Sequence, residues 1–300
     1  MISIIDLFAG LGGFSEGAKR AGHRVVWAAN HNRAACETHA RNHPDTVHAC
    51  QDLQQASFHD LPPHDAFAAS PACQGHSRAR GLERPHHDAM RSTAWAVVTC
   101  AEVHRQKIGV VENVPEFLSW ALYPAWCAAM QALGYSLAPH LIDAADHGVP
   151  QHRRRVFIIC TRSASPLWLK LPKHDYVPAS TVLTDAGTWS SVRSKCARTR
   201  ARVSAGRRAH GNRFLVAYYG NEKGGRSIHR PIGTITTHDR YALVEGGWMK
   251  MITASECRAF MGFSADYKLP ASSTAAKFML GNAVCPDVAA DVFRAIEANA

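Results

Sequence analysis

The sequence lacks several features that would assign it to a whole class of proteins at once. Its nine cysteines include no CxxC pair, so they indicate neither a disulfide framework nor a zinc ribbon and fit a reducing cytosol. No apolar run is long enough to span a membrane, and the N-terminus lacks the pattern of a signal peptide. Internal repeats and low-complexity linkers are also absent. We therefore expect a cytoplasmic, globular protein that has no membrane association.

Acidic residues are missing from one internal stretch, Ala186–Asn221, and this absence points to a partner. The 300 residues carry a formal net charge of +10, which suggests nucleic acid but would suit a merely basic soluble protein equally well. Arginines gather in the stretch beside Trp189 and ahead of an apolar segment, where a disordered tail is not expected. We predict a surface there that contacts phosphate groups. Its expected contact residues are Arg198, Arg200, Arg202, Arg207 and Arg208.

Short apolar runs alternate with helical patterns through the N-terminal half. Buried strands are expected in residues 2–10, 24–30, 64–70, 107–114 and 154–160. Helices are expected in residues 13–22, 34–44, 93–106 and 124–134. Strands alternating with helices of this length predict an α/β fold with a doubly wound, mostly parallel sheet.

The composition changes after Cys160, which predicts a second and smaller domain. Strand-like patterns occur in this part at residues 231–237 and 241–247, followed by a helical pattern at 253–263. The Ala-rich run 281–300 is expected to form a helix that docks back on the first domain. We therefore expect a first domain made of residues 1–160 plus 282–300, and a second made of residues 161–281.

A glycine-rich turn follows the first predicted strand, in "DLFAGLGGF". Gly10, Gly12 and Gly13 let the backbone approach a ligand, although a tight packing turn would explain them equally well. The spacing is Gly-x-Gly-Gly and not GxGxxG, so a dinucleotide site is weakly supported. Asn30 ends the second strand and Asp52 lies near the end of a third, and the two would suit an adenosine, one for the ribose hydroxyls and the other for the adenine amine.

A second group of polar residues falls at later strand ends, where ligands bind in such sheets. Cys73 alone would be read as a small apolar core residue, and Glu112 alone could cap a helix. Arg153 and Arg155, in "VPQHRRRVF", could be surface charges. Together they give a nucleophile, a carboxyl group and two guanidinium groups around one pocket.

One cluster of possible metal ligands, made of Cys36, His39, His43, His48 and Cys50, has a simpler reading. His39 and His43 are four residues apart and share a face of the predicted helix. No spacing in the cluster matches a closed metal site. We therefore expect solvated histidines on a helix face and no metal.

Five motifs then occur in the order in which one enzyme family has them. They are "DLFAGLGG", "SPACQGHS", the triplet Glu112-Asn113-Val114, the run Gln151–Arg155 and "GNAVCP". On these motifs the sequence resembles the cytosine-C5 DNA methyltransferase family. The resemblance covers nearly the whole chain, except the basic region of about 65 residues after Cys160.

The resemblance implies an enzyme that moves a methyl group from S-adenosylmethionine to C5 of a cytosine flipped out of duplex DNA. Cys73 would add to C6 of the base, and Glu112 would hold its N3 and 4-amino edge. Arg155 would grip the O2 side, with Arg153 assisting the pocket. The protein is expected to act as a monomer on double-stranded DNA.

The resemblance also implies two larger sets of binding residues. The expected cofactor contacts are Phe8, Gly10, Leu11, Gly13, Asn30, His31, Asp52, Leu53, Asn282 and Val284. The stretch "GHSRARGLERPHHDAMR" would close over the flipped base. Further DNA contacts are expected from Ser77, Arg78, Arg80 and Gln151. The basic segment, from about Ser163 to His229, takes the place of the family's target-recognition region.

The chain departs from the family pattern at a few positions. Asn30 stands where an acid usually binds the ribose, and His31 replaces an aromatic residue. Ala72 replaces the proline that directly precedes the nucleophile, which loosens the backbone beside Cys73. Ala283 replaces a serine near the cofactor.

Two alternatives stay open beside the DNA enzyme. The first is an RNA cytosine-C5 methyltransferase built from the same motifs, although the basic recognition segment favours duplex DNA. The second is a catalytically silent DNA-binding protein that kept the fold, against which the retained Cys73, Glu112 and Arg155 argue.

Overall fold

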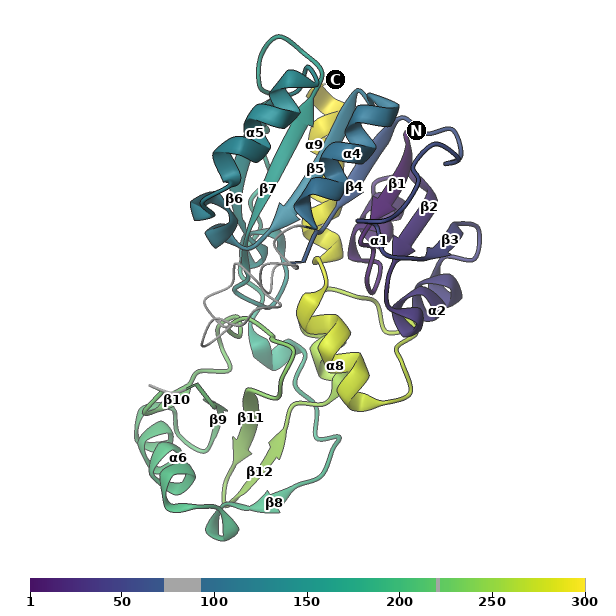
Figure 1. Cartoon of the computed structure of the whole chain (residues 1–300). Helices are drawn as coiled ribbons and strands as arrows, with labels where there is room; N and C mark the ends of the chain where they lie inside the picture. Colours follow the sequence, from purple (N-terminus) through teal and green to yellow (C-terminus); the bar gives the residue numbers. More distant parts are fainter. Residues whose placement is uncertain (73–92, 220–221, 300) are drawn as a thin grey trace. The chain divides into compact units, whose positions relative to one another are not determined.

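The computed structural model describes residues 1–72, 93–219 and 222–299 (Figure 1). The chain divides into two units. The first contains Met1–Asp143, Arg154–Lys173 and Val284–Ala300, and the second contains Ala144–Arg153 and His174–Ala283. The expected boundaries differ from this division in three places, since residues 144–153 and 282–283 join the second unit and residues 161–173 stay in the first. The first difference has a physical cause, because the side chains of Gln151 and Arg153 form their hydrogen bonds inside the second unit.

In the described residues, the first unit contains a sheet of seven strands in the order β3-β2-β1-β4-β5-β7-β6. The strands are β1 (Ser3–Leu7), β2 (Arg24–Asn30), β3 (Val47–Cys50), β4 (Ala66–Ala69), β5 (Ile108–Asn113), β6 (Ser136–Asp143) and β7 (Arg154–Thr161). The pairs among β1 to β5 are parallel, and β7 runs antiparallel to both of its neighbours. The predicted doubly wound, mostly parallel α/β fold is confirmed.

Helices cover both faces of this sheet (Figure 1). They are α1 (Gly13–Arg20), α2 (Arg33–Asn42), α4 (Ala94–His104), α5 (Tyr123–Ala132) and α9 (Pro286–Asn299), with a 3-10 turn, η2 (Pro115–Ser119). Helices α4 and α5 lie on one face, and α9 lies on the opposite face, where it packs against α1. The C-terminal helix begins at Pro286 and not at residue 281, because proline is favoured in the first turn and interrupts any helix that reaches it from before.

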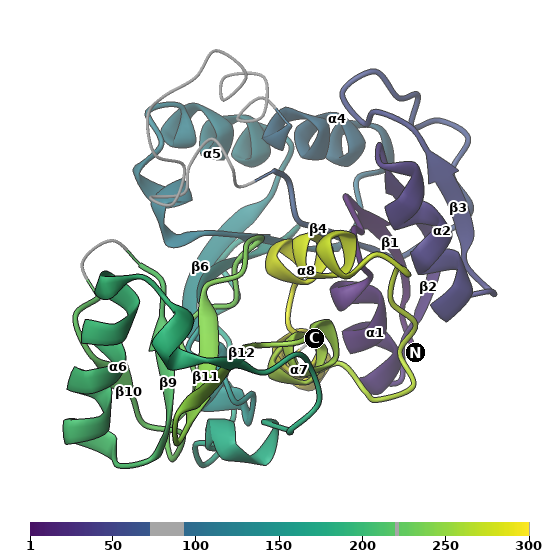
Figure 2. The same ribbon diagram turned by 90° about the horizontal axis from the view of Figure 1, so that it is seen from below.

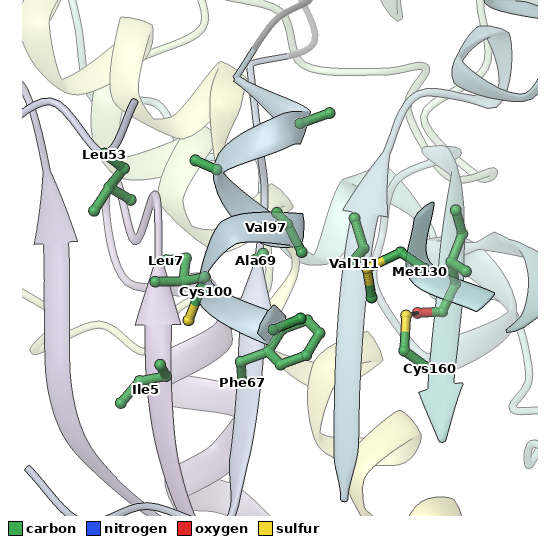
Figure 3. Close-up of a cluster of buried hydrophobic side chains, with 14 of the residues drawn as sticks. Ile5, Leu7, Leu53, Phe67, Ala69, Val97, Cys100, Val111, Met130 and Cys160 are labelled. Atoms are coloured by element: carbon green, nitrogen blue, oxygen red, sulfur yellow. Dashed lines mark hydrogen bonds between the residues drawn. The ribbon is translucent and has the colours of Figure 1, made fainter. Parts of the chain in front are cut away.

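The core of the first unit lies between α4 and the central strands (Figure 3). Val97 and Cys100 of α4 face Leu7 and Ala69 of the neighbouring strands β1 and β4. Cys100 is completely buried, and burial raises the pKa of its thiol to about 12. This cysteine is therefore an inert apolar core residue, as a buried cysteine commonly is.

The second unit is built on an antiparallel sheet with the strand order β10-β9-β11-β12-β8. Its strands are β8 (Ser190–Ser191), β9 (Arg213–Ala217), β10 (Gly225–Arg226), β11 (Tyr241–Glu245) and β12 (Trp248–Met251). The helices are α6 (Ala197–His210), α7 (Ala254–Phe260) and α8 (Ser273–Asn282), with 3-10 turns η3 (Ala144–His147), η4 (Ala179–Thr181) and η5 (Val192–Ser194). Helix α6 packs against β9 and β10 (Figure 2).

A buried ion pair joins two elements of this second unit. Lys250 Nζ of β12 donates to both carboxylate oxygens of Glu256 at 2.8 Å. The carboxylate of Glu256 also accepts from the backbone N–H of Thr253, which caps α7, and from that of Thr184. These bonds hold the pKa of Glu256 below its usual value in spite of burial. Because Lys250 belongs to β12 and Glu256 to α7, the pair joins this helix to the sheet. The hydrogen bonds to both charged groups offset the cost of burying them.

The predicted and observed elements differ in several places. Residues 231–237 form no strand, and only an isolated bridge between Gln151 and Ile232 occurs there. Strand β6 was not predicted, because Pro139 interrupts its apolar pattern. The structure tolerates this proline because β6 lies at the edge of the sheet. In the described part of the chain, no helix is long and apolar enough to cross a membrane.

Candidate active site

The carboxyl ends of β1, β2, β4 and β5 lie at one edge of the first unit's sheet, as their parallel pairing requires. Strand β7 is antiparallel to β5 and pairs Val156 with Asn113, so β7 begins at the edge where β5 ends. Arg155 therefore stands beside the end of β5. This edge collects the residues that the sequence singled out from distant segments of the chain.

The turn after β1 has a backbone that few residues adopt. Gly10 and Gly12 have φ values of 54° and 94°, and even Phe8 has a φ of 63°. The turn is also tightly packed, because a Cβ at Gly13 would lie 2.1 Å from the carbonyl oxygen of Val284. The left-handed positions shape the loop, and Gly13 packs helix α1 against the late motif.

The residues expected to bind an adenosine lie at the ends of β2 and β3. Asn30 is half-buried, and its Oδ1 accepts from the backbone N–H of Asn32 at 2.9 Å. That bond fixes the orientation of the amide, so Nδ2 is the group left to face a ligand. Asp52 and His31 are exposed, and Leu53 is buried.

The late motif contributes residues to both units. Val284 belongs to the first unit and is buried against Gly13. Asn282 belongs to the second unit, where it ends α8 and is exposed. Phe8 and Leu11, the remaining expected cofactor contacts, lie in the turn itself, half-buried and buried respectively.

Cys73, the predicted nucleophile, lies outside the described residues, as do Ser77, Arg78 and Arg80. The two residues before it are described. Asn113 Nδ2 donates to the Pro71 carbonyl at 3.1 Å, and the Ala72 N–H donates to Thr93 Oγ1 at 3.0 Å. The chain that leads into the predicted nucleophile is therefore held by β5 and by the residue that precedes α4.

Glu112 and Arg155 form an ion pair at this edge. Arg155 Nε lies 3.2 Å from Glu112 Oε1, and the two side chains are 15% and 7% exposed. Arg155 Nη1 also donates to the carbonyl of Arg154 at 2.8 Å. A carboxylate and a guanidinium held this close and this poorly hydrated form a preorganised polar pair.

Arg153 and Gln151 are placed differently from Arg155. Both are buried in the second unit, where Arg153 donates to the carbonyls of Ile235, Gly281 and Ala283. The Gln151 side chain accepts from the Ile235 N–H at 2.6 Å and donates to the Phe260 carbonyl at 2.9 Å. Both side chains use these groups to hold the loops of the second unit together, so we assign them a structural role there.

Helix α6 carries the basic stretch, and its arginines divide into two kinds. Arg202 is buried and donates to the carbonyls of Tyr219 and Glu222, so it attaches the helix to the connection between β9 and β10. The other predicted phosphate contacts on this helix are exposed, namely Arg198, Arg200, Arg207 and Arg208. The four exposed arginines make the surface of the helix cationic, and Arg202 is not among them.

The prediction of solvated histidines is wrong for His39 and His43, because both are buried. His39 Nε2 lies 2.9 Å from Ser15 Oγ, and its Nδ1 lies 2.8 Å from His48 Nε2. Burial and the neighbouring imidazoles hold the pKa of His39 well below its usual value, so the ring is neutral. Among the described residues, no group of three or more His, Cys, Asp or Glu is placed to hold a metal ion.

Sequence reasoning missed three side chains that shape this edge. Ser15 donates to buried Asp6 at 2.7 Å and connects it to His39. Asn113 was noticed only as part of a motif, although its amide holds Pro71. Thr93 gave no signal at all, since a threonine ahead of a helix is ordinarily read as a cap.

Solved structures with the same architecture define the class to which this fold belongs. A protein described as a prophage-encoded DNA modification methyltransferase from E. coli superposes with a TM-score of 0.75 at 19% identity, over 99% of both chains. A triple mutant of Spodoptera frugiperda DNMT2 superposes with a TM-score of 0.69 at 16% identity, over 99% of this chain and 100% of that one. The fold is that of the Rossmann-like methyltransferases.

The family follows from the sequence. The profile of the C-5 cytosine-specific DNA methylase family matches residues 2–195 and 183–298, and the chain belongs to this family. Type II methyltransferase M.AgeI of Thalassovita gelatinovora is 32% identical over 181 residues, which cover 57% of this chain and 42% of M.AgeI. Type II methyltransferase M.NlaX of Neisseria lactamica is 26% identical over 313 residues, which cover 96% of this chain and 94% of M.NlaX.

Proposed function

We propose that this protein transfers a methyl group from S-adenosylmethionine to C5 of a cytosine in double-stranded DNA, acting as a monomer. The observation that carries the proposal is the Glu112–Arg155 ion pair, at 3.2 Å, at the edge where the chain leads into Cys73. Such a pair offers a carboxyl group and a guanidinium to the two polar edges of one pyrimidine. Family membership supplies the reaction class.

The turn after β1 and the end of β2 fit the cofactor. The left-handed residues Phe8, Gly10 and Gly12 bring backbone close to a ligand, and Asn30 Nδ2 is oriented to donate to a ribose hydroxyl. Asp52 and Leu53 would contact the adenine. S-adenosylmethionine supplies an electrophilic methyl group when it is bound. A neutral amide at residue 30 makes weaker hydrogen bonds than a carboxylate, so cofactor affinity is expected to be modest.

Cys73 would make C5 of the cytosine reactive, because C5 of the free base is too weak a nucleophile to attack the methyl group directly. Its thiolate adds to C6, and the electrons of the C5–C6 double bond move to C5, which takes the methyl group. Glu112 would hold N3 and the 4-amino group while charge develops on the base, and Arg155 would bind O2. Loss of the C5 proton then expels the Cys73 thiolate and restores the double bond.

The base must leave the duplex for Cys73 to reach C6. The exposed arginines of α6, on the second unit, supply charge for phosphate contacts that hold the DNA during this step. Arg202, Gln151 and Arg153 are left out of the proposed contact set, because their polar groups are used within the unit.

The test is transfer of labelled methyl from S-adenosylmethionine to unmethylated duplex DNA, with wild type beside Cys73→Ala. We expect label on cytosine C5 with the wild type and a loss of at least about a thousandfold in the variant, since the nucleophile is gone. Transfer RNA serves as the competing substrate. Label in transfer RNA alone would replace the DNA proposal by an RNA methyltransferase, and tight DNA binding without label would leave a silent binder.

A further inference from the structure

A hydrogen bond joins the two described residues that flank segment 73–92. The backbone N–H of Ala72 donates to Thr93 Oγ1 at 3.0 Å. Ala72 follows strand β4, and Thr93 stands directly before α4. The bond therefore ties the point where the chain leaves the sheet to the point where it enters the helix.

The other polar group of the same peptide unit is held as well. The Pro71 carbonyl accepts from Asn113 Nδ2 at 3.1 Å, and Asn113 Oδ1 accepts from the Val114 N–H at 2.8 Å, which orients the amide. No cis peptide bond occurs in the described residues, so this C=O and this N–H lie in one rigid peptide plane and point in opposite directions. Side chains on both sides thus hold the plane that precedes the nucleophile.

The family's Pro-Cys motif has proline where this chain has Ala72. A proline ring fixes φ at about −65° and supplies no N–H. Alanine leaves φ free, but it supplies the N–H that Thr93 accepts. The substitution therefore removes one constraint on the backbone and makes another possible, and the structure contains the partner that the second constraint needs.

We propose that Thr93 is a positioning residue for Cys73: its hydroxyl orients the peptide plane ahead of the nucleophile and replaces part of the constraint that proline gives. The role rests on the proposed function, in which Cys73 attacks cytosine. Only φ and ψ of Ala72 separate the held plane from the Cα atom of Cys73. Because attack requires a close and aligned approach, the hydroxyl acts on kcat more than on substrate binding.

The first experiment tests the hydrogen bond between the Ala72 N–H and Thr93 Oγ1 without measuring methyl transfer. Hydrogen exchange of the Ala72 amide is measured at single-residue level in wild type, Thr93→Ser and Thr93→Val. We expect slow exchange in wild type and Thr93→Ser, and exchange about tenfold faster in Thr93→Val, which keeps the volume but loses the acceptor. Equal exchange rates of the Ala72 amide in all three proteins would show that Thr93 does not hold this N–H, and would overturn the proposal.

The matched control for these variants is Thr99→Val on α4, the helix that Thr93 precedes. Thr99 is exposed, and its Oγ1 donates to the Trp95 carbonyl of α4 at 3.3 Å. The change of side chain is the same, but the hydroxyl has no part in the Pro71–Ala72 plane. Exchange at Ala72 and methyl transfer are expected to stay within twofold of wild type; faster exchange here would assign the effect to α4 in general.

The second experiment is a double-mutant cycle with Ala72→Pro, in the methyl-transfer assay. Thr93→Val is expected to lower kcat about tenfold with KM unchanged, and Thr93→Ser to restore it. In the Ala72→Pro background no N–H exists for Thr93 to accept, so Thr93→Val is expected to change kcat by less than twofold. An equal loss in both backgrounds would contradict the positioning role and leave a structural one.

The two experiments also separate this proposal from the proposed function. If wild type transfers no methyl group to DNA or RNA, the proposed reaction fails, and the positioning of Cys73 for that reaction fails with it. The exchange result would still decide whether Thr93 holds the peptide plane. If the wild type transfers methyl groups and the Thr93→Val variant has the same kcat, the proposed reaction is supported and only the role of Thr93 is overturned.

Discussion

Asp6 is a fully buried carboxyl group with a single hydrogen-bonded oxygen. Its Oδ2 accepts from Ser15, and its Oδ1 has no hydrogen-bond partner among the described residues. Burial raises the pKa of Asp6 to about 7, against the lowering effect of Ser15. The hydrogen bonds continue from Ser15 through His39 to His48 in β3. A proton taken up at Asp6 therefore changes a hydrogen-bond network that reaches from the glycine-rich turn to β3.

The raised pKa predicts how Asp6 affects stability. Between pH 4 and 7 the folded state holds a proton that the unfolded state has lost, so the contribution of Asp6 falls as pH rises through this range. Relative to Asp6→Asn, the free energy of unfolding of the wild type is expected to drop by about 2 kcal/mol from pH 5 to pH 8. Urea denaturation of both proteins at several pH values measures the difference.

A control for this measurement is Asp65→Asn. Asp65 is exposed, and hydrogen bonds from Ser3 lower its pKa, so it stays ionised throughout the pH range used. The buried histidines have lowered pKa values and lose their contribution as pH falls, which is why the comparison uses a difference from wild type. A difference for Asp6→Asn that did not change with pH would show that Asp6 is ionised in the folded protein.

At the scale of the element, α1 and the late motif form one packed joint. Gly13 opens α1 against the backbone of Val284, and Gly17 lies against Ala289 of α9, where an added Cβ would come within 2.5 Å. Helices α1 and α9 are far apart in sequence, and this joint of small residues lets them approach closely. The turn that is proposed to bind the cofactor therefore depends on the C-terminal helix for its position.

Gly13→Ala tests this joint. A Cβ there would lie 2.1 Å from a carbonyl oxygen, and backbone cannot move aside as a flexible side chain can. The variant is expected to lose roughly 1–3 kcal/mol of unfolding free energy and to bind S-adenosylmethionine at least about tenfold more weakly. Gly224→Ala is the control, because an added Cβ there meets no atom within 4 Å. Thermal unfolding and calorimetric titration check the two effects, and cofactor affinity equal to wild type would place the joint outside the binding turn.

The same scale shows how far the sequence predicts this molecule. Strands buried on both faces, such as β1 and β4, are nearly continuous apolar runs and are readily predicted. Helix α6 was not predicted, because six arginines and histidines in fourteen residues obscure any apolar face. The sequence also could not separate Arg155 from Arg153, since only tertiary packing turns one toward Glu112 and the other into the loops of the second unit.

At the scale of the whole molecule, the net charge of +10 is unevenly distributed, and α6 carries four exposed arginines. Arg200 and Arg207 also donate to nearby backbone carbonyls, so replacing them would disturb the second unit. Arg208 donates to Ser204 of its own helix, and Arg198 is exposed near the start of α6. Both side chains are exposed, so replacing Arg198 and Arg208 removes two charges from the surface of this helix.

Removal of both charges predicts a change in the salt dependence of DNA binding. Each phosphate contact contributes about −0.9 to the slope of log K against log salt, so Arg198→Ala with Arg208→Ala is expected to reduce the slope by about 1.8. Fluorescence anisotropy with a labelled duplex at several salt concentrations measures it. Arg33→Ala, which removes an exposed charge from α2 in the first unit, is expected to leave the slope unchanged. A slope altered by Arg33→Ala and not by the α6 variant would move the proposed DNA surface to the first unit.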